Sequence, residues 1–176
     1  MSDRQAAFDR FFAQITHPGL RDVARHWNDV RGAKLMPAWR DIDPMALARH
    51  LPMIWAWRYD RVTEQFTGRL CGEMIREAFG RSLRGARMDE FFLGEGYPLV
   101  YVRHRRILTE PCFSRDHGAV FRHVDRVGHG ERIILPLGES EIGDTVFGAT
   151  IYDPTQMALI HHARVEFDNL EYFPLQ

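Results

Sequence analysis

The apolar residues of this chain change their spacing along its length, and these changes constrain the fold more than any other feature. The spacing is helical up to residue 32, alternates over 53–59 and 66–72, is helical again as far as residue 108, and alternates from residue 112 onward. Helical spacing gives a helix one apolar stripe, whereas alternation gives a strand one apolar face. The sequence therefore predicts helices, then two strands, then short helices, then three strands.

Capping residues set the bounds of the predicted N-terminal helices. A first helix is expected over residues 2–15. In the second helix, Thr16 is the expected cap, Pro18 suits the first turn, and Gly32 ends the helix. The pair Asp43–Pro44 combines a capping residue with a proline at the first helical position, so it predicts a short third helix.

Further short helices are expected between the two groups of strands. One covers residues 74–79 and is closed by Gly80, and another begins near Met88. The longest covers residues 97–108, because Pro111 forbids its continuation.

The strand-like segments are expected to form one antiparallel sheet. A polar turn separates 53–59 from 66–72, which predicts a hairpin. Glycine-marked turns at 128–130 and 138–144 join three later strands. These later strands are expected at 112–124, 131–137 and 145–152. The predicted class is α+β: a five-stranded antiparallel sheet with short helices on one face, preceded by N-terminal helices.

The length of 176 residues, 45% of them hydrophobic, favours a single core. Within it we expect an N-terminal helical flank at 1–32, a core at 33–153 and a C-terminal tail at 154–176. The tail is ambiguous: a helix through His162 followed by an extended arm is one interpretation.

Composition excludes several classes of function. A net charge of −1 lacks the basic excess that nucleic-acid binding requires. The first residues lack a secretory signal, and no apolar run approaches the roughly 20 residues needed to cross a bilayer, so a cytoplasmic protein is expected. Cys71 and Cys112 have no metal-ligand spacing and are expected to be reduced, buried thiols.

Several glycines lie between residues 66 and 91, after a predicted strand. Their spacing fits neither the dinucleotide fingerprint nor the phosphate loop. Gly80 and Gly85 are therefore interpreted as turn glycines that permit a positive φ between short helices.

The order of elements resembles the PAS fold, and several short motifs resemble a bacterial family of short, stand-alone PAS-like proteins. The matching elements between residues 17 and 153 are Trp27, RG at 31–32, DIDP at 41–44, LP at 51–52, RLCG at 69–72, AFGRSLRG at 78–85, ILPL at 134–137 and FGATIY at 147–152. The resemblance implies a sensory or regulatory domain that binds a small molecule, relays a signal to a protein partner, or does both.

PAS domains bind ligands between the sheet and the short helices, so the resemblance implies a site there. His104 shares a helical face with Tyr97, Val100, Tyr101 and Leu108. The candidate ligand-binding residues are Trp57, Met74, Phe79, Phe92, Tyr101, His104, Leu108, Phe121, Leu135 and Phe147. Resemblance to haem-binding PAS domains would make His104 an axial ligand, and the simpler interpretation is a local hydrogen bond. The adduct-forming cysteine motif of flavin-binding relatives is absent.

Anion binding, metal binding and catalysis were also considered. Arginines at 81, 84 and 87 and at 103, 105 and 106 could attract a carboxylate or phosphate, or simply be solvated. The nine histidines form no compact ligand set, so no metal site is predicted. Asp116, His117 and Glu110 are the nearest acid and base candidates, but no nucleophile elbow accompanies them, and no catalytic residue is assigned. A small cavity enzyme of cone-shaped α+β type remains an alternative.

The N-terminal helices carry large apolar side chains at Phe8, Phe11, Phe12 and Trp27. These either cover the sheet or form an exposed interface, and we expect them to support a homodimer. A further alternative is an adaptor without a ligand, whose interior is filled by large side chains such as Trp55 and Trp57.

Overall fold

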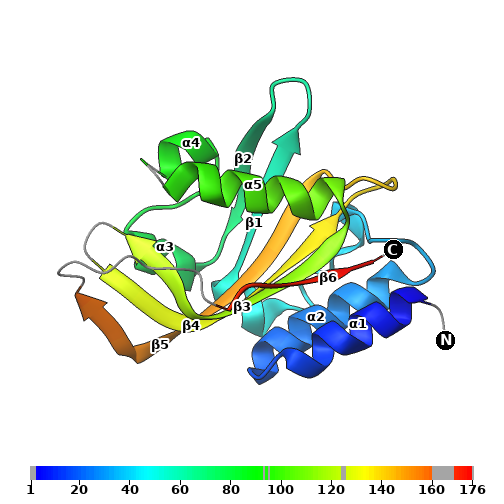
Figure 1. Cartoon of the computed structure of the whole chain (residues 1–176), viewed down its shortest axis with the longest axis horizontal. Helices are drawn as coiled ribbons and strands as arrows, with labels where there is room; N and C mark the ends of the chain where they lie inside the picture. The colour runs from blue at the N-terminus through cyan, green and yellow to red at the C-terminus, as the bar shows by residue number, and fades with distance from the viewer. Residues whose placement is uncertain (1–2, 93, 95, 124–125, 160–168, 176) are drawn as a thin grey trace.

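The computed structural model describes residues 3–92, 94, 96–123, 126–159 and 169–175. It contains a six-stranded antiparallel sheet in the order β2-β1-β5-β4-β3-β6, with helices on both faces (Figure 1). The strands are β1 (Ile54–Asp60), β2 (Gln65–Cys71), β3 (Cys112–His123), β4 (Arg126–Leu137), β5 (Thr145–Leu159) and β6 (Glu171–Pro174). The helices are α1 (Asp3–Gln14), α2 (Pro18–Arg31), α3 (Glu73–Phe79), α4 (Met88–Phe91) and α5 (Gly96–Thr109), with 3-10 turns η1 (Trp39–Asp41) and η2 (Ala48–Met53).

The two faces of the sheet bury separate apolar clusters. We call the face beneath α3, α4 and α5 the inner face; its strand residues include Trp57, Ile134 and Val146. The outer face packs against α1 and α2 and includes Leu135 and Phe147. Consecutive strand residues point to opposite faces, so each strand contributes to both clusters. In Figure 1, α5 crosses one side of the sheet and the paired α1 and α2 lie on the other. The predicted α+β architecture is confirmed.

Most predicted elements occur close to their expected bounds. The hairpin, the helix closed by Gly80, the helix at Met88 and the long helix before Pro111 are all present. Gly80 and Gly85 have φ values of 68° and 78°, as expected for turn glycines. Within the described residues, no helix is long and apolar enough to cross a membrane.

Two predictions about helix starts are wrong. His17, not Thr16, caps α2: its ring nitrogen Nδ1 accepts a hydrogen bond from the Gly19 amide at 3.1 Å. The segment after Asp43 forms a turn followed by η2 rather than an α-helix. The carboxylate of Asp43 accepts from the Met45 amide at 2.8 Å, which closes a local turn that competes with a helix.

The C-terminal half differs from expectation in three ways. The glycines at 128–130 lie inside β4, where the pairing with β5 shifts register, so they mark a bulge and not a turn. Strand β5 continues to Leu159, and the tail adds the sixth strand, β6, beside β3. The helix expected through His162 falls outside the described residues.

Candidate ligand-binding interior

Six of the ten candidate ligand-binding residues come together between the inner face and the short helices. They are Trp57, Phe79, Phe92, Tyr101, His104 and Leu108. Met74 packs instead against the cluster of the outer face. Leu135 and Phe147 also belong to that cluster, because their strand neighbours Ile134 and Val146 occupy the inner positions. These three residues therefore do not line the interior. The side chain of Phe121 lies outside the described part of the structure.

His104 is the central polar residue contributed by α5. Its side chain is buried, and the ring centroid lies 5.5 Å from that of Trp55 and 5.9 Å from that of Phe66. Nδ1 lies 2.8 Å from the Val100 carbonyl oxygen, which can only accept, so Nδ1 carries the hydrogen. Nε2 then has a free lone pair, and it meets no hydrogen-bond partner among the described residues. Burial, followed by the charge of Arg103, lowers the pKa of His104 well below its usual value, so the ring is neutral at physiological pH.

A row of buried polar groups crosses the inner face from β3 to β5. Arg132 donates to Asp116 at 3.4 Å and to the Thr150 hydroxyl at 3.2 Å. From above the sheet, Arg103 of α5 reaches the same Asp116 oxygen at 3.2 Å. The second oxygen of Asp116, Oδ1, has no described partner. A buried carboxylate normally fills its acceptor capacity, so this oxygen can take a donor from a bound molecule.

Trp55 links the polar row to His104. Its indole Nε1 donates to Thr150 at 2.9 Å, and its ring lies beside the imidazole. The indole lies directly over Gly148, where a Cβ atom would come within 2.2 Å of the ring. The absence of a side chain at Gly148 therefore allows the Trp55 indole to pack directly against the backbone of β5.

Tyr59 and Tyr101 meet at one end of the interior, and Tyr152 lies apart from them near Arg132. The hydroxyls of Tyr59 and Tyr101 are 3.4 Å apart, and Tyr101 also donates to the Glu64 carbonyl at 3.2 Å. Burial and the contact with Tyr59 raise the pKa of Tyr101. Burial raises the pKa of Tyr152, on β5, to about 12. Both phenols are therefore protonated donors at neutral pH.

The residues around His104 do not fit haem. Nε2 is the atom that would bind the iron, but it is sealed from solvent, and the rings of Trp55 and Phe66 pack close to the imidazole. The described residues also contain no group of three or more histidine, cysteine or carboxylate side chains that could hold a metal ion.

The alternative acid and base candidates are not brought together. Asp116 points to the inner face, whereas its neighbour His117 lies near Arg115, at 3.2 Å. Glu110 is exposed and pairs with Arg106 at 3.4 Å. The arginines at 81, 87 and 105 bind carbonyls or carboxylates at separate surface positions and do not form one anion site.

The aromatic residues of the N-terminal helices cover the outer face. Phe8, Phe11 and Trp27 are buried, and Phe11 stacks on Phe113 of β3 with centroids 4.6 Å apart. Phe12 is partly buried against the same cluster. These four side chains therefore do not form the exposed apolar patch considered for an interface.

Sequence reasoning missed Asp116, Arg132 and Thr150 as members of one site. Thr150 stands alone among apolar residues, but Asp116 and Arg132 have charged neighbours, so the sequence does not single them out. The strand register, with Asp116 opposite Arg132 and Arg132 opposite Thr150, is what joins them.

Comparison with known proteins gives one match. A family model described as a PAS domain matches residues 15–151, which is most of the chain. No curated protein and no solved structure matches. The match covers both strand groups and the short helices between them, and the sheet order and the covered inner face agree with it. The chain belongs to the PAS domain family, whose members are in general sensory or regulatory domains.

Proposed function

We propose that this PAS domain binds a small molecule in the interior around His104 and Arg132 and relays its presence to the helices α1 and α2. The observation that carries the proposal is a pair of ion pairs placed back to back across the sheet. Arg132 and Asp116 pair on the inner face. Their chain neighbours Glu131 and Arg115 pair on the outer face, at 2.8 Å.

The inner side supports binding because unused acceptors lie within an aromatic enclosure. Nε2 of His104 and Oδ1 of Asp116 are buried and lack described partners. Leaving such atoms without a donor costs roughly 1–3 kcal/mol each. A small ligand that reaches them through a rearrangement of the surrounding aromatic rings would therefore gain affinity by donating hydrogen bonds to them.

The outer side supports relay because Glu131 holds the corner between α1 and α2. Its carboxylate accepts from the Thr16 amide at 2.9 Å, the Thr16 hydroxyl at 2.7 Å and the His17 amide at 2.8 Å. The same carboxylate accepts from Arg115. If β3 moved relative to β4 at the Arg132–Asp116 pair, the Glu131 carboxylate would move as well. The segment between α1 and α2, which this carboxylate binds, would then shift with it.

The mechanism requires that the domain adopt two conformations that differ at the corner between α1 and α2. The ligand must bind one conformation more tightly than the other, because only that difference in affinity can shift the equilibrium between them. Signal output then passes through the surface of α1 and α2 to a protein partner. Because Phe8, Phe11 and Trp27 are buried on the sheet, we place no homodimer interface on them.

A ligand-free adaptor is the second candidate, and the packing of the aromatic rings favours it. Phe91 lies 5.0 Å from Phe79 and 5.7 Å from Trp57, centroid to centroid. Such rings can fill an interior without a ligand. In this case the domain would bind its partner without any bound small molecule.

The deciding experiment uses the purified chain. Native mass spectrometry and an absorption spectrum report any ligand that co-purifies, and thermal-shift screening with a metabolite library reports those that bind. Hydrogen exchange then follows the amides of Thr16 and His17 with and without the hit. We expect a bound ligand to change their exchange rates, and Glu131→Gln to abolish that change while preserving binding. Glu139→Gln, at an exposed position, is the control. A chain that accepts no molecule, yet captures a partner, would support the adaptor.

A further inference from the structure

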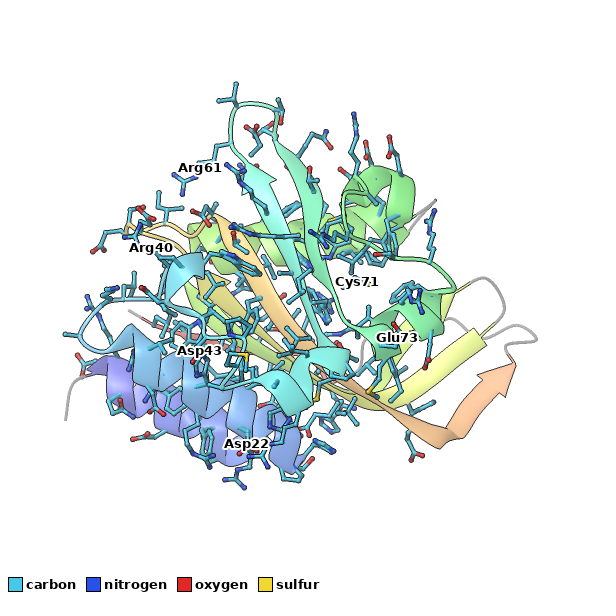
Figure 2. The ribbon with its side chains drawn as sticks, turned by 180° about the vertical axis from the view of Figure 1, so that it is seen from behind. Asp22, Arg40, Asp43, Arg61, Cys71 and Glu73 are labelled. Carbon is cyan, nitrogen blue, oxygen red and sulfur yellow. The ribbon has the colours of Figure 1, made fainter. Side chains whose placement is uncertain are left out.

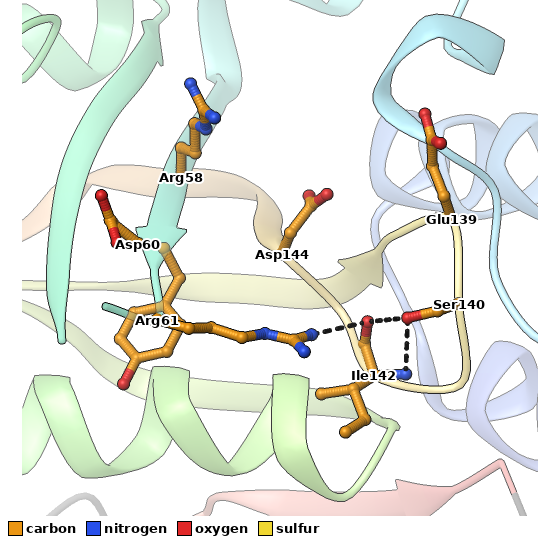
Figure 3. Close-up of a pocket in the computed structure, with 8 residues that line it drawn as sticks. Arg58, Asp60, Arg61, Glu139, Ser140, Ile142 and Asp144 are labelled. Atoms are coloured by element: carbon orange, nitrogen blue, oxygen red, sulfur yellow. Dashed lines mark hydrogen bonds between the residues drawn. The ribbon is translucent and has the colours of Figure 1, made fainter. Parts of the chain in front are cut away.

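A second pocket lies away from the interior, where the end of β1 meets the turn between β4 and β5 (Figure 3). Its volume is about 450 Å³, within the range of small-molecule sites. Arg58 and Arg61 line it together with the carboxylates of Asp60, Glu139 and Asp144. Figure 2 shows Arg61 and Arg40, the partner of Glu139, on the same side of the molecule.

Most of these charges already have partners. Arg61 donates to the backbone carbonyls of Ile142 and Gly143, both at 3.0 Å. Asp144 accepts from the Thr145 hydroxyl at 2.7 Å, and Glu139 pairs with Arg40 at 2.6 Å.

Asp60 is committed to its own turn. Its carboxylate accepts from the amides of Val62, at 2.8 Å, and Thr63, at 3.2 Å. Among the described charged side chains of the pocket, Arg58 alone has no hydrogen bond or ion pair to another described residue. It extends away from the hydrogen-bonded Arg61 in Figure 3.

A second arginine, Arg69, lies on the neighbouring strand β2, outside the residues that line the pocket but near enough to Arg58 to interact with its charge. The pairing of β1 with β2 shifts register between Ala56 and Trp57, which makes Arg69 the extra residue of a bulge. The guanidinium carbon of Arg69 lies 4.1 Å from the centroid of the Trp39 ring, and Arg69 forms no ion pair with a described carboxylate. Burial, and then the charge of Arg58, lower the pKa of Arg69, while Asp144 partly opposes them. The fold thus holds two like charges near each other. Neither forms an ion pair with a described carboxylate, although Asp60 interacts electrostatically with Arg58 and Asp144 with Arg69.

We propose that Arg58 and Arg69 bind the phosphate group of a small phosphate monoester whose body occupies this pocket. A phosphate monoester carries a charge of about −1.5 to −2 at neutral pH, which matches two guanidinium groups, whereas a carboxylate matches one. Arginine also binds phosphate oxygens through paired N–H donors. Trp39 fixes the plane of Arg69, so little side-chain entropy is lost on binding. This site is independent of the interior proposed as the sensory site.

Isothermal titration of the full chain at low ionic strength tests the proposal, with glycerol 3-phosphate, glycerol and acetate as probes. We expect glycerol 3-phosphate to bind at least about tenfold more tightly than the other two. Arg58→Met and Arg69→Met should each weaken binding about tenfold, and Arg58→Lys, which keeps the charge but loses the fork, should weaken it less.

Arg84→Met removes an exposed arginine outside the pocket and is the matched control. Arg58 is itself exposed, so its replacement tests the site without disturbing the core. The proposal is overturned if glycerol 3-phosphate does not bind the wild-type chain, if acetate binds equally well, or if Arg84→Met weakens binding as much as Arg58→Met does.

Discussion

Arg132 and Glu131 are consecutive residues of β4, yet each is half of a buried ion pair on a different face of the sheet. Arg132 meets Asp116 beneath α5, and Glu131 meets Arg115 beside the corner of α1 and α2. Because both partners are also consecutive on β3, the two faces are coupled through two adjacent strand positions. The following predictions test this coupling and the packing that supports it.

Replacement of Glu131 by glutamine should destabilise the domain by about 2 kcal/mol, because the buried Arg115 would lose its nearer charged partner and keep only Glu171, at 3.7 Å. The variant should also loosen the start of α2, because the amides of Thr16 and His17, just before the helix, lose their anionic acceptor. Urea unfolding measures the effect. Glu139→Gln, which breaks only an exposed pair, should change stability by less than about 1 kcal/mol. Equal losses in both variants would contradict the structural role of Glu131.

Stability should fall as the pH drops below 6.5, the ordinary pKa of histidine, because His104 resists protonation in the folded state. The unfolded chain then binds a proton that the folded chain does not, so acid favours unfolding over the window between 6.5 and the lower folded-state pKa. Within this window, His104 lowers the free energy of unfolding by as much as about 1.4 kcal/mol for each unit of falling pH. Unfolding free energies at several pH values should show a weaker dependence in His104→Phe than in the wild type. His129→Gln, which removes a histidine at a half-exposed position, is the control.

Gly148→Ala should destabilise the domain by about 1–3 kcal/mol, because the new methyl group collides with the Trp55 indole. Moving the indole would also break its hydrogen bond to Thr150. Near-ultraviolet circular dichroism and thermal unfolding measure both effects. The matched control is Gly96→Ala at the start of α5, where a Cβ meets nothing within 4 Å. We expect that control to be neutral or slightly stabilising.

The spacing of apolar residues was enough to predict the type and order of most elements, because each has a strong period and clear breakers. It could not predict which face of a strand would be the inner one. Leu135 and Ile134 are equally apolar, and only the packing of α1, α2 and α5 decides that Ile134 lies inside. For the same reason, the sequence alone could not tell that Val146 lies on the inner face and Phe147 on the outer face.

The polar row illustrates a second limit of sequence analysis. Asp116, Arg132 and Thr150 are far apart in the sequence, and their contact depends on strand register. A shift of one residue would send each side chain to the other face. Strand β6 is only four residues long, too short to give a periodic signal, and it is held by pairing with β3.

Asp116→Asn should speed hydrogen exchange at the His17 amide, although Asp116 lies on the opposite face from that amide. The substitution removes the charge that two buried arginines share, so β3 and β4 lose their tie beneath α5. If the strands move, the Glu131 carboxylate moves with them and releases the corner of α1 and α2. Exchange measured by mass spectrometry, compared with amides at the end of the β1–β2 hairpin, separates this local release from general destabilisation. Uniform acceleration at both places would mean that the two faces respond only through global stability, and the relay across the sheet would be rejected.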